Sequence, residues 1–219
     1  MVKNNEDYLI TWNLYGNYST SSGFQILPTD RKLYLGTSHG RKILKSYNFS
    51  YRPLEVLPGW RQYFNVLARE LQLDENYKPI ERIDYNYYDK YGNILEKVEN
   101  NSKHTVFLWS HYGQNPRARI ENATYQEVSF VLGCKLEDLS ALTVYTPILD
   151  NDFRIKLPCA RVFTYWCNQR NSITTSTAPN GQSTYYTYDK RGRLIQTYQL
   201  NEEGRMEILQ LNNYHIVNE

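Results

Sequence analysis

The stretch YYTYDKRGRL, Tyr185 to Leu194, places three tyrosines directly before an Asp-Lys-Arg-Gly unit. The first position of a type I turn favours Asp, Asn or Ser, because the side-chain oxygen accepts hydrogen bonds from backbone amides inside the turn. The fourth position favours Gly, because the chain often passes there through positive φ. A type I turn followed by a left-handed Gly closes a β-hairpin with a bulge. The stretch therefore predicts two antiparallel strands joined by a turn from Asp189 to Gly192.

The same spacing recurs along the chain. The other units are NLYG at Asn13–Gly16, DKYG at Asp89–Gly92, SHYG at Ser110–Gly113 and NEEG at Asn201–Gly204. An aromatic residue precedes four of the five units, where a ring at the end of one strand can pack against the next strand. Both Asp89 to Ser110 and Asn168 to Asp189 are 21 residues apart, which is about two strands and two turns. We therefore predict a hairpin tip at each unit.

Composition and alternation support this prediction. The chain of 219 residues contains 21 tyrosines, and its Tyr, Thr, Val and Ile content favours strands. In STYYTY, Thr184, Tyr186 and Tyr188 share one face, and RLIQTYQL after the turn also alternates. The stretches PIERIDYNYY and NILEKVEN around Asp89 show the same two-residue period. The fold class expected is mainly β, as a curved antiparallel hairpin array.

One segment, near residues 124–142, has a helical pattern instead. Thr124 and Glu127 have the spacing of a capping box, and apolar residues then recur at helical intervals up to Gly133. One short helix is expected there, to which the stretch KLEDLSAL, residues 135–142, adds a turn or two, and residues 146–158 are expected to be a connection. Such an insertion usually covers one end of a sheet, and a partner-binding projection is the alternative.

Two stretches resemble a known family. YYTYDKRGRL and YYDKYGNILEKVENNSKHTVFLW, residues 87–109, are similar to the YD repeats of bacterial RHS (rearrangement hot spot) proteins, in which Tyr-x-Tyr-Asp is followed by a Gly three residues on. The matching motif positions are Tyr88, Asp89 and Gly92 in one copy and Tyr186, Tyr188, Asp189 and Gly192 in the other. Asn86 stands where the first tyrosine is expected, and Ser110 and Gly113 keep the turn residues without the full motif. The resemblance covers residues 78–121 and 160–217.

The resemblance implies an architecture rather than a reaction. Members of this family form a spiralling β-sheet that closes into a hollow shell, commonly around a toxin domain, and they are secreted or associated with the cell envelope. We expect this chain to be a segment of such a toxin-delivery shell that meets a protein partner, or a second copy of itself, through open sheet edges. The expected division is a β-rich segment at 1–60, repeat-like hairpins at 61–121, a helical insertion and connection at 122–158, and repeat-like hairpins at 159–219.

Composition argues against several other classes. With 25 basic and 23 acidic residues scattered along the chain, we expect neither nucleic-acid binding nor a membrane span, and no signal peptide is recognised at the N-terminus. The three cysteines and four histidines fit no metal-binding spacing, so no metal or other cofactor is expected. Asp89 and Asp189 are explained by turn capping, and we therefore expect no catalytic residues and no enzyme activity.

A carbohydrate-binding module is the alternative. Exposed aromatic rings on a β-sheet offer flat apolar faces on which sugar rings can stack. The candidate residues are Tyr165, Trp166, Tyr185 and Tyr198. The same rings can instead serve cross-strand packing, and the alternation does not decide which face meets solvent.

Overall fold

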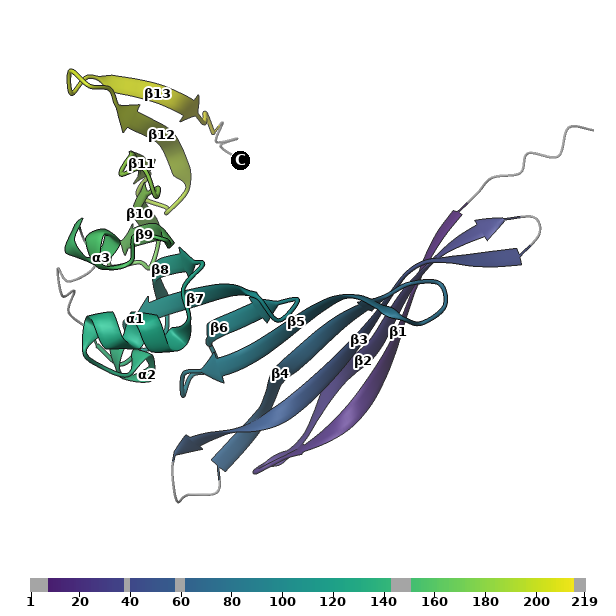
Figure 1. Cartoon of the computed structure of the whole chain (residues 1–219). Helices are drawn as coiled ribbons and strands as arrows, with labels where there is room; N and C mark the ends of the chain where they lie inside the picture. The colour runs from purple at the N-terminus through teal and green to yellow at the C-terminus, as the bar shows by residue number, and fades with distance from the viewer. Residues whose placement is uncertain (1–7, 38–39, 58–61, 143–150, 215–219) are drawn as a thin grey trace, which may run out of the picture. The chain divides into compact units, whose positions relative to one another are not determined.

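The computed structural model describes residues 8–37, 40–57, 62–142 and 151–214. Within these ranges, 13 strands form one antiparallel sheet in which each strand neighbours the strands before and after it in sequence (Figure 1). The strands are β1 (Tyr8–Thr20), β2 (Gly23–Thr37), β3 (Gly40–Leu57), β4 (Gln62–Leu73), β5 (Pro79–Tyr88), β6 (Ile94–Glu99), β7 (Lys103–Ser110), β8 (Asn115–Glu121), β9 (Arg161–Cys167), β10 (Ile173–Thr177), β11 (Ser183–Tyr188), β12 (Leu194–Leu200) and β13 (Met206–Leu211). The mainly β, hairpin-array fold predicted from the sequence is confirmed.

The chain divides into two compact units, Met1–His104 and Thr105–Glu219. In the first unit β1–β4 are the longest strands, and the sheet curls so that the end of β1 meets the start of β4 (Figure 1). The amide of Ser21 donates to the carbonyl of Tyr63 at 3.2 Å, and the Asn65 side chain donates to the carbonyl of Ser19 at 2.6 Å. Farther along this unit, Leu95 and Val98 of β6 are buried.

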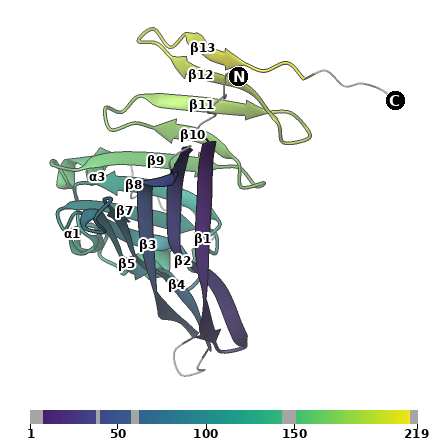
Figure 2. The same cartoon turned by 90° about the vertical axis from the view of Figure 1, so that its right-hand side faces the viewer.

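The core of the second unit lies on one face of β7–β9. Val106 is opposite Ile120, which is opposite Val162, and all three side chains are at most 1% exposed. In the described residues three helices follow β8, namely α1 (Tyr125–Leu132), α2 (Leu136–Leu139) and α3 (Asn151–Lys156). Of these, α1 and α3 lie beside β7–β9 in two views (Figures 1 and 2). Each of the three helices carries a buried apolar side chain, Val128, Leu136 and Phe153 respectively. We infer that these side chains cover the core face.

Local sequence explains where α1 begins and ends. The Thr124 hydroxyl accepts from the Glu127 amide, the Glu127 carboxylate accepts from the Thr124 amide, and Gly133 closes the helix at φ 68°. The capping box and the helix are therefore confirmed, and the further helical turn expected within residues 135–142 is α2. Within the segment expected to be a connection, Asn151–Lys156 form the short helix α3, while residues 146–150 lie outside the described ranges. Tertiary burial of Phe153 stabilises this short helix, which has too few residues for a recognisable period.

Candidate interaction surface

Asp189 builds the hairpin tip between β11 and β12. Its Oδ1 atom accepts hydrogen bonds from the amides of Arg191 and Arg193, both at 2.9 Å, and its Oδ2 atom accepts from the Arg193 guanidinium at 2.7 Å. The Gly192 amide donates to the Asp189 carbonyl at 3.0 Å, with Gly192 at φ 81°. The backbone hydrogen bond from Arg193, followed by its side chain and by the Arg191 amide, holds the pKa of Asp189 below its usual value. Both oxygens of this carboxylate therefore have partners within the tip.

Asp89 builds the tip between β5 and β6 in the same way. Its Oδ1 atom accepts from the amides of Tyr91 and Asn93 at 2.9 and 2.8 Å, and Gly92 has φ 85°. The residue itself is 0% exposed. In both copies the preceding tyrosine reaches an adjacent strand, because Tyr88 donates its hydroxyl hydrogen to the carbonyl of Leu67 at 2.6 Å. Tyr188 donates correspondingly to the carbonyl of Ile173 at 2.7 Å.

Further tips share these hydrogen bonds. The five-residue loops Asp74–Lys78, Asn168–Ser172 and Asn201–Arg205 have the same two backbone bonds and the same capping oxygen, and Ala178–Gln182 has the backbone bonds alone. Of these four loops, the Asp/Asn/Ser-to-Gly spacing in the sequence had identified only the one that begins at Asn201. At the loops that begin with Asp74 and Asn168 the left-handed position is occupied by Tyr77 and Asn171, each at φ 60°. An Asp or Asn followed by a strand is the signal that could have identified these two loops.

The turn predicted at Asn13–Gly16 is wrong, because these residues lie inside β1 and pair with β2 around a bulge at Leu14 and Tyr15. The actual hairpin joins Thr20 to Gly23. Pairing along β1 satisfies the backbone groups that face β2, which a single turn-capping oxygen cannot match.

The tip at Ser110–Gly113 also differs from the prediction. Ser110 ends β7, and the next three residues, His111, Tyr112 and Gly113, all have positive φ. The His111 amide donates to the carbonyl of Leu142 at 2.7 Å, and the Gly113 amide donates to the carbonyl of Ser140 at 2.9 Å. The segment after α2 therefore supplies the acceptors that a capping serine would have supplied.

The four aromatic residues proposed for ligand stacking do not share one face. Trp166 is opposite Thr175, Thr175 is opposite Tyr185, and Tyr185 is opposite Tyr198, so their side chains form one row across β9–β12. Tyr165 belongs to the opposite face because neighbouring residues of a strand alternate. The rings of Tyr185 and Tyr198 stack on each other, with centroids 5.1 Å apart and planes at 18°. Each of these two rings therefore offers at most one face to a ligand.

A shallow, open hollow of about 600 Å³ lies beside Tyr186 and Tyr188. Its lining comes from β10, β11 and two successive tips on the same end of the strands, Asn168–Ser172 and Asp189–Arg193. Arg170 connects these tips, because its guanidinium donates to the carbonyl of Lys190 at 2.8 Å. The hollow brings together Tyr186, Tyr188, Asp189 and Gly192 of the sequence motif.

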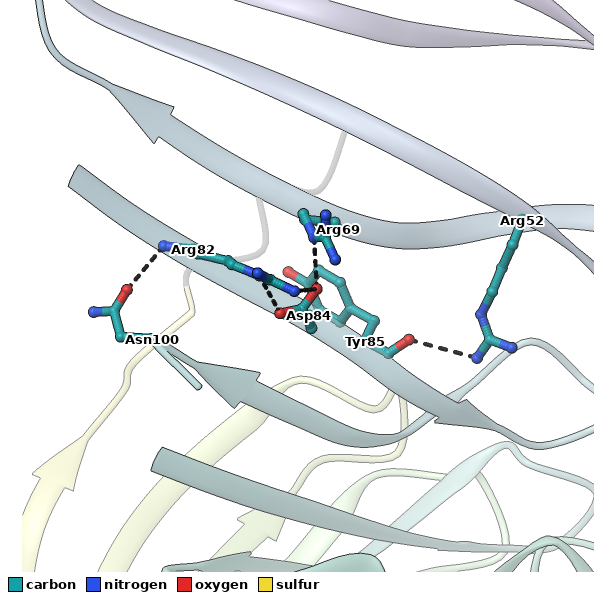
Figure 3. A network of polar contacts seen from close by, with 6 residues as sticks. All are labelled: Arg52, Arg69, Arg82, Asp84, Tyr85 and Asn100. Carbon is teal, nitrogen blue, oxygen red and sulfur yellow. Dashed lines mark hydrogen bonds and ion pairs between the residues drawn. The ribbon is translucent and has the colours of Figure 1, made fainter. Parts of the chain in front are cut away.

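A polar network in the first unit was not identified from the sequence (Figure 3). Asp84 of β5 accepts from Arg69 of β4 at 2.6 Å and from Arg82 at 2.5 Å. Burial raises the pKa of Asp84, but the hydrogen bonds from Arg82 and Arg69 outweigh it and hold the pKa below its usual value. Asp84 therefore acts as a clamp between two strands, β4 and β5. At the neighbouring position, burial, followed by the nearby Glu70 carboxylate, raises the pKa of Tyr85 to about 12.

The guanidinium of Arg52, on β3, extends this network to a third strand. It donates to the backbone carbonyl of Tyr85 (Figure 3) and to that of Asn86. It also lies over the ring of Tyr88, 5.6 Å from the ring centroid. Its partners are backbone oxygens and an aromatic ring, and none is a titratable pair of the kind that acid-base catalysis needs. Within the described ranges, no cluster of three His, Cys, Asp or Glu side chains could hold a metal ion, and no helix has the length and apolar character needed to cross a membrane.

Comparisons with known proteins show weak structural likeness. No protein-family model matches the sequence, and no curated protein matches it. The chain is similar to the Photorhabdus luminescens Tc holotoxin pore, with TM-score 0.26 and 11% identity over 84% of this chain and 12% of that chain. It is similar to TcdB2-TccC3-TEV at TM-score 0.26 and 11% identity, over 88% of this chain and 9% of that chain. A porin-like protein from Bacteroides uniformis has TM-score 0.24 and 10% identity, over 90% of this chain and 91% of that chain. This chain thus spans 12% or less of the two toxin chains it is similar to.

Proposed function

We propose that this chain is a non-enzymatic β-sheet module of the RHS and YD-repeat type, which acts as a structural scaffold and interaction surface within a toxin-delivery shell. The observation that supports this most directly is the use of the Tyr-Asp motif. At both copies the aspartate oxygens cap the tip, and the tyrosine hydroxyl bonds an adjacent strand. A motif whose polar atoms are used in this way contributes to architecture and leaves no group poised for chemistry.

The outer edge of β13 is the part of the sheet best suited to contact another chain. Among the described strands β13 neighbours only β12, and all six of its side chains are exposed. Met206, Ile208, Leu209 and Leu211 are 53–61% exposed. An apolar edge strand favours pairing with a further strand, and β13 carries no proline or lysine that would oppose it. We therefore propose self-association through this edge.

Self-association can be tested by measuring molar mass at increasing protein concentration with light scattering. We expect the chain to associate, and we expect Leu209→Lys to weaken association by about tenfold or more, equal to about 1.4 kcal/mol, because a lysine on the edge must lose water. Phe130→Lys is the matched control, because Phe130 is an 87% exposed apolar residue on α1. A chain that stays monomeric at all concentrations, or equal weakening by both substitutions, would contradict the proposal.

A carbohydrate-binding module remains the second candidate, and the row Trp166–Thr175–Tyr185–Tyr198 is the observation that favours it. Three half-buried aromatic residues lie on one sheet face, and Trp166 also carries the Arg117 guanidinium 5.0 Å from its ring centroid. Binding on a glycan array that is lost with Trp166→Ala and Tyr198→Ala, but kept with Tyr165→Ala on the other face, would support this candidate. Binding unchanged by all three substitutions would reject it.

A further inference from the structure

Basic residues gather at one end of strands β9–β12. The tips at this end, Asn168–Ser172 and Asp189–Arg193, carry four cations and one carboxylate. The tips at the other end, Ala178–Gln182 and Asn201–Arg205, carry one cation and two carboxylates. The two ends of these strands therefore differ in charge, and the positive end lies beside the hollow.

The carboxylate at the basic end does not neutralise its neighbours. Asp189 is bound to Arg193 at 2.7 Å, so this pair is satisfied internally. Arg170, Lys190 and Arg191 are exposed and form no ion pair with another described residue. Arg170 and Lys190 both line the hollow. A hollow between two hairpin tips therefore presents two cations whose charge is available to a ligand.

The other groups of the lining add donors rather than stacking surfaces. The Oδ1 atom of Asn168 caps its own tip, and the Thr174 hydroxyl donates to the carbonyl of Trp166 at 3.3 Å. The donors that the lining offers to a ligand are therefore the side-chain NH₂ groups of Asn168 and Gln169. Tyr186 and Tyr188 are half-buried, and their hydroxyls are engaged by Ser176 and by the carbonyl of Ile173. Tyr186 also lies on the face opposite Tyr185, whose ring stacks on Tyr198. The flat aromatic platform that a sugar ring needs is therefore on the other side of the sheet.

We propose that this hollow is a docking site for an acidic peptide segment of a partner protein. A guanidinium binds a carboxylate through two parallel hydrogen bonds, and a lysine adds a point charge at a second position, so Asp or Glu side chains are complementary to this pair. Hydrogen-bonding side chains along the lining suit the polar backbone of an extended peptide. This inference rests on the proposed role as an interaction surface and adds a second contact site, separate from the β13 edge.

The probe for this site is a fluorescein-labelled hexaglutamate peptide, titrated with the whole chain by fluorescence anisotropy at low ionic strength, about 0.05 M. We expect binding that weakens with salt. The double substitution Arg170→Gln and Lys190→Gln is expected to weaken it by about tenfold or more. Lys190→Gln alone keeps the Arg170 hydrogen bond to the residue 190 carbonyl and is expected to have a smaller effect in the same direction. Arg205→Gln removes one cation from a tip at the other end and is expected to change nothing.

Three outcomes would overturn the proposal. They are no binding of hexaglutamate at low salt, equal binding by wild type and the double variant, and tighter binding of an acidic saccharide such as oligogalacturonate with the same dependence on Arg170 and Lys190. Thermal unfolding of each variant shows whether a loss arises from misfolding.

Self-association through β13 is measured on the same samples. If it persists while hexaglutamate fails to bind, only this inference fails, and if hexaglutamate binds without self-association, only the edge proposal fails.

Discussion

At the scale of single residues, the aspartate and the glycine of a hairpin tip have different roles. Asp189 supplies a carboxylate oxygen that satisfies two backbone amides, and Gly192 supplies a backbone that turns through φ 81° without a Cβ atom. Gly92 has the equivalent conformation, but a Cβ atom there would lie 3.0 Å from the ring of Phe64, whereas the space around Gly192 is open. The two glycines therefore differ in packing while sharing a conformation.

This difference predicts unequal effects of alanine. Gly192→Ala should lower the free energy of unfolding by about 1–2 kcal/mol, because the left-handed conformation costs an L-residue that much. Gly92→Ala should cost more, because Phe64 must also move. Asn tolerates positive φ, so Gly192→Asn is the control and should cost less than Gly192→Ala. Urea unfolding measures each loss. Equal losses for the two alanines, or an asparagine as damaging as alanine, would contradict the interpretation.

At the scale of elements, neighbouring strands are held together by side chains that bridge them. Asp84 on β5 binds Arg69 on β4, and Arg52 on β3 reaches the backbone of β5 (Figure 3). Arg82 provides the second guanidinium from the same strand as Asp84. Since the pKa of this carboxylate is lowered in the folded chain, folding favours its ionised form.

The Asp84 clamp therefore makes stability depend on pH in acid. Its contribution is fully present above the ordinary carboxyl pKa of about 4 and is lost as pH falls through the lower folded value. The midpoint of thermal unfolding should be higher for wild type than for Asp84→Asn near neutral pH, and the gap should narrow as the pH is lowered below about 4. A gap that is constant across this range would rule out ionisation of Asp84 as its cause.

Contacts with other elements can override the conformation that turn residues favour. The loop after β7 has the spacing of a capped tip, yet its amides bond to carbonyls that follow α2. The unit at Asn13 likewise becomes part of a strand because β2 pairs with it throughout. In both cases the competing partner is distant in sequence, so a short motif cannot reveal it. At Asp89 and Asp189 the capping hydrogen bonds are made within the tip itself, and there the motif predicts the observed tip.

At the scale of the whole molecule, alternation and turn spacing predicted an antiparallel hairpin array, and sequential pairing of all 13 strands confirms it. Such a topology is predictable because each strand pairs with the next one along the chain, so local signals are sufficient. The capping box at Thr124 was predictable for the same reason. The strand-bridging arginines were not, because they depend on the register between strands. The basic hollow was not, because it depends on which tips lie at the same end of the strands.

The five-residue loops of β9–β13 have one further consequence. Their shared backbone bonds make the loop frame independent of the residues at its exposed positions, as KRG in one tip and EEG in another demonstrate. The charge of the exposed tip residues can therefore change sign by substitution or loop exchange without disturbing the hydrogen bonds between the strands. For protein engineering, and for divergence among related sequences, the exposed tip residues can vary while the backbone of each loop stays the same. New partner preferences can therefore arise at the tips with little loss of stability.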